Sequence, residues 1–397
     1  MGGTKPKVMQ RDGVTATGYL MLATFGWLIY TFGPAIPLIR DGLEISRTLA
    51  SLHSVTFAIG IVVAGLAASL TIRRIGRAST LRLGLLLVLL GVVGLSIGSL
   101  LSVGALFVTL AAAGTAGLGG ALANNTAIAV LSDHHGDLSP TVLSEGNALA
   151  SGIGLIAPLA LGLAAASILT WRPAMLAIFL LLGLVAWLLS KSSSSQAFTV
   201  VPAAQTSERL PSDYWPMWFA LIACIMVEFS VVAWSPDLVR DRLELGPGIA
   251  SALPSAFLAG MFIGRVAVAR LSLDTDAKRL FLASLGLALI GWVLLWATTV
   301  VWLALLGLAL TGLGAAGQFP LGSALLIRTA KGNTDRAVGV MAAGLGAAAG
   351  AGPFVLASLA DGLGIYLAFL MVPACLIAAA VLSMVSTTAP KTESGHS

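Results

Sequence analysis

A single carboxyl group stands near the centre of a long apolar run, at Glu228 in the segment IMVEFS (residues 225–230). An ionised carboxylate surrounded by hydrocarbon is costly unless it is paired, protonated or open to water, so such residues mark ion and substrate pathways. We therefore expect Glu228 to bind a proton or a substrate. The alternative is a structural carboxyl that hydrogen-bonds to a neighbouring helix.

Aromatic and amide side chains in other apolar runs are the next candidates. Trp27 and Tyr30 are three residues apart, which places them on one helix face, and Trp234 follows Glu228 by six residues. Amides buried in lipid need hydrogen-bond partners, which a water-filled cavity supplies. The alternatives are lipid-facing or interfacial aromatics and amides that join helices. The residues that we expect to line a substrate or proton site are Glu228, Trp234, Trp27, Tyr30, Asn124, Asn125 and Gln318.

Other kinds of chemistry lack the residues that they need. No GxxxxGK[ST] loop occurs that could hold a nucleotide phosphate. Cys224 and Cys375 lie in apolar runs, without the spacing of a disulfide framework or a zinc site. The pair His134-His135 is expected in a solvated loop, and no nucleophile–base pattern is visible. We expect no cofactor, no metal site and no enzymatic activity.

The composition is that of a membrane protein. Of the 397 residues, 57% are hydrophobic and 10% are charged, and the mean hydropathy is +0.96; a soluble domain carries about a quarter charged residues. A membrane-spanning helix needs about 20 mostly apolar residues. The sequence contains runs of this kind at 16–38, 48–70, 80–99, 103–127, 141–166, 172–190, 215–237, 249–270, 279–298, 300–327, 336–360 and 364–386.

The positive charges predict how the chain crosses the membrane. With a cytoplasmic N-terminus, the outer loops receive only Arg40, Arg47, Arg172, Arg240 and Arg242 of the 22 lysines and arginines. The positive-inside rule therefore places both termini in the cytoplasm. We expect a multi-pass protein of the cell membrane, in a bacterium the inner membrane. The net charge of +5 lies in short loops, so it does not indicate nucleic-acid binding.

The chain contains an internal repeat. The segment IRDGLEIS (residues 39–46) recurs 200 residues later as VRDRLELG (residues 239–246), and the polar stretch 191–213 separates the two copies. Parallel repeats of this kind build transporters from two related bundles that move about a site between them. We expect an N-terminal six-helix bundle at 1–190, a cytoplasmic linker at 191–213 and a C-terminal six-helix bundle at 214–397.

The second half resembles the fucose permease-like branch of the major facilitator superfamily. The resemblance is carried by Glu228 with Trp234, by SAFLAGMFIGR (residues 255–265) and by residues 312–320. It implies an all-α membrane protein of twelve helices that carries sugars or related small polar solutes with protons. The chain departs from the characterised sugar symporter, since residues 27–37 hold no acid and Leu122 lies near the place of a second one. Only the Glu228 position carries over.

Four arginines are candidates for gating through the same resemblance. The segment RRIGR (residues 73–77) is similar to a loop signature of the superfamily, although Arg73 stands where the family has an acidic residue. The Gly264-Arg265 pair resembles the copy of that signature in the second half. The gating residues implied are Arg73, Arg74, Arg77 and Arg265. For Arg265, a side chain that simply extends to the membrane surface is the alternative.

Proton-coupled transport of a small solute by alternating access is the function that these observations favour. Proton-driven efflux of drugs or hydrophobic metabolites is the alternative, because fixed polar groups are few. A membrane sensor that transports nothing would need a signalling domain, and the polar segments here are short. The expected partners are a small-molecule substrate, protons and the lipid bilayer, and the expected state is a monomer.

Overall fold

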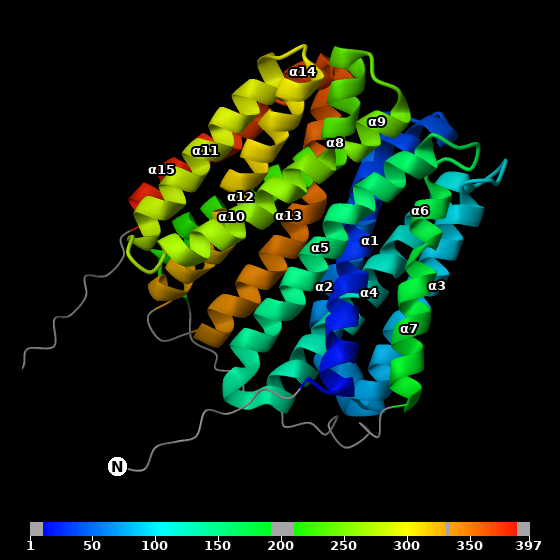
Figure 1. Cartoon of the computed structure of the whole chain (residues 1–397), viewed down its shortest axis with the longest axis vertical. Helices are drawn as coiled ribbons and strands as arrows, with labels where there is room; N and C mark the ends of the chain where they lie inside the picture. Colours follow the sequence, from blue (N-terminus) through cyan, green and yellow to red (C-terminus); the bar gives the residue numbers. More distant parts are fainter. Residues whose placement is uncertain (1–10, 192–209, 331–333, 387–397) are drawn as a thin grey trace, which may run out of the picture.

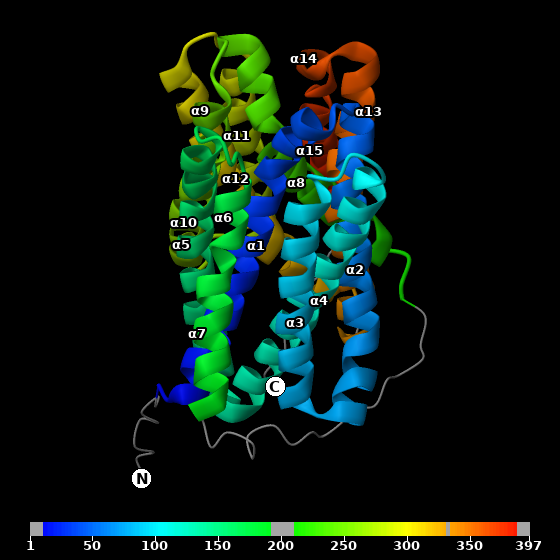
Figure 2. The same ribbon diagram turned by 90° about the vertical axis from the view of Figure 1, so that its right-hand side faces the viewer.

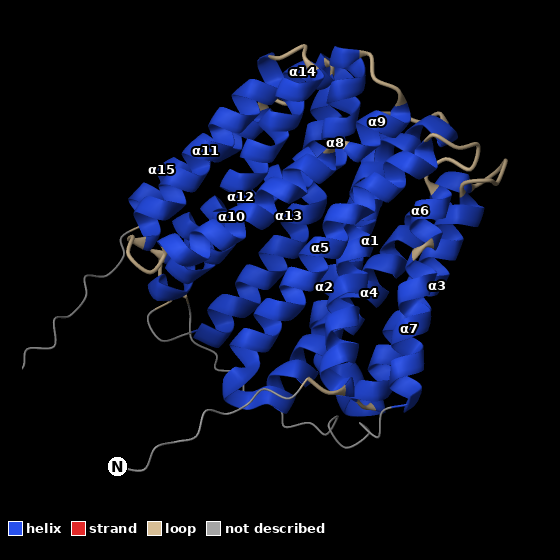
Figure 3. Cartoon of the chain, viewed as in Figure 1, coloured by secondary structure: helices blue, strands red, loops and turns tan. Residues whose placement is uncertain are grey.

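The structure is a computed structural model that describes residues 11–191, 210–330 and 334–386. Most of these residues are helical and short loops connect the helices, with no strand among the described residues (Figure 3). Twelve helical segments in the described ranges are long and apolar enough to cross a membrane, which confirms the predicted fold class. The linker expected at 191–213 lies largely outside the described residues.

Six spanning segments come from the first half of the chain and six from the second (Figure 1). Short breaks divide the sixth, eighth and twelfth segments into two helices each. The first half forms α1 (Gly13–Leu43), α2 (Arg47–Ile75), α3 (Arg77–Gly98), α4 (Ala105–His135), the 3-10 turn η1 (Gly136–Leu138), α5 (Ser139–Ala165), α6 (Arg172–Leu176) and α7 (Ile178–Lys191). The second half forms α8 (Tyr214–Leu243), α9 (Pro247–Ala252), α10 (Pro254–Leu271), α11 (Ala277–Ala297), α12 (Val301–Thr329), α13 (Thr334–Leu363), α14 (Ile365–Ala368) and α15 (Met371–Val385).

Several helices extend beyond the apolar runs that predict them. The fourth run was expected to end at 127, whereas α4 continues to His135, past both asparagines. Pro320 lies inside α12 without ending it, because packing and local adjustment in membrane proteins satisfy the backbone groups that a proline frees. Hydropathy detects only the apolar part of a helix, so the predicted runs leave out the polar turns at the helix ends.

The internal repeat is visible in the backbone. Glu44 ends α1 and Glu244 ends α8, and both adopt the left-handed conformation with φ of 52°. Equivalent helices also pack alike. A Cβ atom on Gly117 would overlap the carbonyl oxygen of Phe57, so α4 can lie directly against α2. Gly312 and Phe257 make the same approach between α12 and α10.

A larger residue at Gly312 should therefore push α12 away from α10. We expect Gly312→Val to lower the free energy of unfolding by about 1–3 kcal/mol, the usual cost of overpacking. Thermal unfolding of the detergent-purified protein measures the effect. Gly286→Val on α11 is the control, because a Cβ there meets nothing within 4 Å. Equal melting temperatures for the two variants would contradict the prediction.

The two halves meet along three seams. Helix α1 packs on α8, α2 on α13, and α5 on α9 and α10. In the view of Figure 2, α1 runs between α5 with α7 on one side and α2 with α4 on the other. The end of the bundle where α1 and α8 finish is called the Asp237 end, and the opposite end, where α2 finishes, is called the Arg77 end. Toward the Arg77 end the second half leans away from the first (Figure 1).

Candidate functional site

Charged side chains from both halves interlock at the Asp237 end. Asp237 on α8 is 1% exposed, and its Oδ2 accepts from Arg40 Nη1 at 2.7 Å and from Arg47 Nε at 2.6 Å. In the reverse direction, Arg240 Nη1 donates to Asp41 Oδ2 at 2.6 Å. The arginine and aspartate of one repeat thus pair with partners from the other half. Together with Asp241, which Arg47 Nη2 approaches at 3.4 Å, these residues form the Asp237 cluster.

A second contact at this end ties α2 to α13. The carboxylate of Asp361, near the end of α13, accepts from the backbone N–H groups of Arg47 and Thr48 at 3.0 and 2.8 Å. The first N–H groups of a helix have no acceptor within the helix itself, and a carboxylate is a favoured partner for them. The end of α1, the start of α2 and the ends of α8 and α13 therefore hold the two halves together at the Asp237 end.

A pocket lies between the halves, farther along the same helices. It lies between α1, α2, α8 and α13, and the space between atoms there amounts to about 460 Å³, which includes space open to solvent. Most of the lining is apolar or aromatic, and the polar side chains in it are Tyr30, Ser54 and Glu228. Its residues are Ile29, Tyr30, Phe32, Gly33, Ser54, Phe57, Ala58, Glu228, Phe229, Val232, Ala233, Ala349 and Pro353.

Glu228 and Tyr30 face this pocket from opposite halves. Glu228 precedes Asp237 by nine residues on α8, a rise of about 14 Å along the helix, so it lies well inside the span. The Tyr30 hydroxyl on α1 and the Arg265 guanidinium on α10 both interact electrostatically with the Glu228 carboxylate. The structure thus brings together two of the expected site residues, and it adds a cation.

Arg265 reaches across the interface between the halves. Its Nη1 donates to the Ser151 hydroxyl on α5, and its Nη2 lies 3.9 Å from Met261 Sδ. Within the described residues no carboxylate oxygen lies within 4.0 Å of Arg265, although the side chain is exposed. An arginine facing lipid within a spanning helix would be costly. Since Ser151 lies on the opposite half, the exposed guanidinium borders the interface between the halves.

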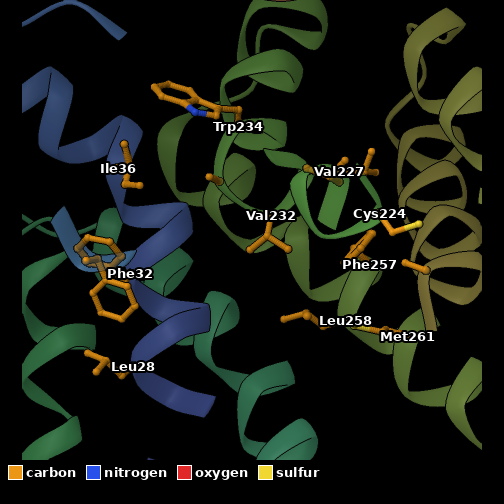
Figure 4. Close-up of a cluster of buried hydrophobic side chains, with 14 of the residues drawn as sticks. Leu28, Phe32, Ile36, Cys224, Val227, Val232, Trp234, Phe257, Leu258 and Met261 are labelled. Atoms are coloured by element: carbon orange, nitrogen blue, oxygen red, sulfur yellow. The ribbon is translucent and has the colours of Figure 1, made fainter. Parts of the chain in front are cut away.

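The two expected tryptophans do not line this pocket. Trp27 Nε1 donates to the Ala174 carbonyl of α6 at 3.1 Å, and Trp234 Nε1 donates to the Pro353 carbonyl of α13 at 3.1 Å. Trp234 is fully buried among the apolar side chains of the core (Figure 4). Both indoles therefore join helices within their own half. The three-residue spacing predicted that Trp27 and Tyr30 lie on one side of the helix, but it did not show that only Tyr30 reaches the pocket.

The contacts of Trp234 predict a packing role. Trp234→Phe should lose one hydrogen bond to Pro353, a loss of about 1 kcal/mol in unfolding free energy, and should keep transport activity. Trp234→Ala should cost about 3–5 kcal/mol because it empties a buried site. Thermal unfolding and solute flux, measured on the same preparations, separate the effects. Loss of flux in Trp234→Phe at unchanged stability would instead assign the indole to binding.

The expected amides lie outside the pocket as well. Asn124 is half-buried with an Oδ1 atom that has no hydrogen-bond partner in the described structure, and Asn125 is exposed. Gln318 is 3% exposed, and its Nε2 likewise has no partner in the described ranges. A buried amide without a partner is unusual. None of the three amides is a neighbour of Glu228 in the pocket lining.

The sequence matches the model of the Major Facilitator Superfamily over residues 18–275 and 217–397, which together cover most of the chain. This chain belongs to the major facilitator superfamily. Its members are transporters, so the chain is a multi-pass membrane protein with a transporter fold and not an enzyme. A comparison with curated protein sequences finds no match.

Solved structures of this superfamily share the fold over almost the whole chain. A bacterial homolog of the human lysosomal transporter Spinster, inward-facing and unoccupied, aligns with TM-score 0.70 at 13% identity over 97% of this chain and 98% of that one. The nucleoside transporter NupG aligns with TM-score 0.73 at 10% identity over 94% and 98%. A D-xylose-proton symporter aligns with TM-score 0.73 at 15% identity over 96% and 98%. At these identities the likeness is one of fold.

The arginines that the superfamily resemblance singled out lie in different settings. Arg73 and Arg74 are exposed in the last turn of α2. Arg77 begins α3, is buried and pairs with Asp133 near the end of α4, inside the first half. Arg265 lies apart from these three, beside Glu228. Sequence reasoning missed Ser151 as its partner, and no local pattern marks that serine.

Proposed function

We propose that this chain is a proton-coupled secondary transporter that carries a small solute across the membrane by alternating access. The observation that carries the proposal is the position of Glu228. It is a carboxyl group well inside a spanning helix, beside a pocket between two six-helix bundles, and it interacts with Tyr30 of the opposite bundle. A proton taken up there changes the interactions between the halves at the place where a solute would bind.

The remaining contacts support a rocking mechanism. Superfamily transporters bind solute near the membrane midplane and expose the site to each side in turn as one bundle moves against the other. The Asp237 cluster holds the bundles together at one end in this structure. Breaking these ion pairs while the Arg77 end closes would give the opposite state. With both termini in the cytoplasm, as the charge distribution favours, the Asp237 end faces outward.

The pocket lining limits the class of solute. A sugar carries many hydroxyl groups, which need matching polar groups, yet the pocket offers mainly Tyr30, Ser54 and Glu228. We therefore place the solute among compounds with a substantial apolar part. The same lining favours the second candidate function, efflux of hydrophobic metabolites or drugs by a proton-driven exchange.

A ligand screen followed by flux measurements tests the proposal. The purified protein is screened by thermal shift against sugars, nucleosides, amino acids, organic acids and cationic dyes, at mildly acidic and mildly alkaline pH. Stabilising compounds are then tested in proteoliposomes under an imposed pH gradient. We expect at least one compound to accumulate against its own gradient when protons flow. If the pH gradient changes the flux of none of the stabilising compounds, proton coupling is overturned. The direction of movement separates uptake from efflux.

A further inference from the structure

From the charges around the pocket, we propose that the solute is an amphipathic monocarboxylate. Its carboxylate binds Arg265, and its apolar part occupies the pocket between α1, α2, α8 and α13. The inference rests on the proposed function and names the substrate class of that site. It also gives Arg265 a role in binding, beyond the gating that the superfamily resemblance implies.

The first argument is that the N–H donors of Arg265 have no carboxylate partner among the described residues. Its guanidinium is fixed by the Ser151 hydroxyl through Nη1, while no carboxylate oxygen of the described residues approaches within 4.0 Å. The side chain is nevertheless exposed. A guanidinium presents paired N–H donors that match a carboxylate, and it retains its charge in all ordinary conditions. An exposed arginine held in this way is suited to bind an anion.

The second argument is the number and sign of the charged groups around Glu228. The titratable and charged groups that face Glu228 are Tyr30 of α1, Arg265 of α10 and Cys224 of its own helix α8. The remaining lining from α2 and α13 is uncharged. One guanidinium therefore serves this site, which fits a single carboxylate better than a dianion. The aromatic rings of Phe32, Phe57 and Phe229 provide contact for an apolar body.

These positions couple the solute to a proton. With Glu228 ionised, its charge offsets that of Arg265, and an incoming carboxylate meets like charge in a medium that screens it poorly. When a proton from solution binds the Glu228 carboxylate, Arg265 becomes the uncompensated charge and the solute anion takes its place as counter-ion. One proton and one carboxylate then occupy the site together. Release of the proton to the other side restores the competition and expels the solute.

The test uses a panel of monocarboxylates with uncharged and cationic analogues of the same shape. Butyrate, octanoate and 3-phenylpropionate are compared with their amides and amines, by isothermal titration calorimetry on the full-length purified protein at mildly acidic and mildly alkaline pH. We expect the larger carboxylates to bind, to bind more tightly than their amides, and to weaken as the pH rises. Amines that bind more tightly than the carboxylates, or carboxylates no better than amides, would overturn the inference.

Variants assign the binding to named groups. Arg265→Ala should weaken octanoate binding roughly 10- to 100-fold, the usual worth of a charged hydrogen-bonding partner, and Arg265→Lys should recover part of it. Arg270→Ala is the control, because Arg270 is an exposed residue on the same helix. In Glu228→Gln the carboxylate should bind even at alkaline pH. Unchanged affinity in correctly folded Arg265→Ala would exclude Arg265 as the binding group.

The same experiments distinguish this inference from the function on which it rests. Proton-driven accumulation of a non-anionic solute, together with no preference for carboxylates, would remove the monocarboxylate assignment and keep the transporter. Carboxylate binding that depends on Arg265, without any proton-driven flux, would keep the site and remove proton coupling.

Discussion

Replacing Glu228 by glutamine is expected to abolish proton-driven solute accumulation while leaving the protein folded. Glutamine keeps the size and hydrogen-bonding capacity of the side chain, but it cannot exchange a proton. In proteoliposomes with an imposed pH gradient, uptake should fall to the level of protein-free vesicles. Exchange of labelled for unlabelled solute, which needs no net proton movement, should continue.

Two comparisons make this result specific to Glu228. Glu44→Gln, at an exposed position past the end of α1, is the matched control and should accumulate solute like the unmodified protein. The melting temperature of both variants should stay close to that of the parent. Normal accumulation with an unchanged pH profile in Glu228→Gln would make the group a structural carboxyl, the alternative that its sequence context leaves open.

Replacing Asp237 by asparagine should release the two bundles at the Asp237 end. Asp237 is buried and pairs with both Arg40 and Arg47, and removal of one member of a buried ion pair costs roughly 3–5 kcal/mol. The cost falls on the state seen here, in which this end is closed. The equilibrium should move toward the open state by about two to four orders of magnitude.

Chemical labelling measures this shift. Ser54 lines the pocket and is buried, so a cysteine introduced there, with Cys224 and Cys375 replaced by serine, reports access. A membrane-impermeant maleimide added at the Asp237 end should label Ser54→Cys much faster when Asp237→Asn is also present. Asp274→Asn, an exposed change at the other end, is the control. Equal labelling rates in both would show that the cluster does not hold this end closed.

Asp41 offers a graded comparison. It pairs with Arg40 and Arg240, but its side chain is 37% exposed, and ion pairs open to solvent contribute little. Asp41→Asn should therefore accelerate labelling of the Ser54→Cys reporter far less than Asp237→Asn. The comparison tests whether burial, rather than the number of partners, decides the strength of this contact.

The sequence was most informative where a property is local. Hydropathy identified twelve spans because each helix must satisfy its own backbone in lipid and cover itself with apolar side chains. Glu228 was recognisable for the same reason, since a charge in such a run is conspicuous wherever the helix packs. The repeat of residues 39–46 at 239–246 was recognisable from its charged residues, and the glutamate of each copy adopts the same left-handed conformation.

Tertiary structure alone decided which of these residues meet. A helix presents side chains on every side, and only packing between the halves placed Tyr30 beside Glu228 while it turned Trp27 and Trp234 toward carbonyl groups. The charged residues of the two repeat copies were assigned to separate loops, and the fold brings them together in the Asp237 cluster. The sequence predicted a gating role for Arg265, with extension to the membrane surface as the alternative. Its position between Ser151 and Glu228 follows from contacts between α5, α8 and α10, which no local pattern encodes.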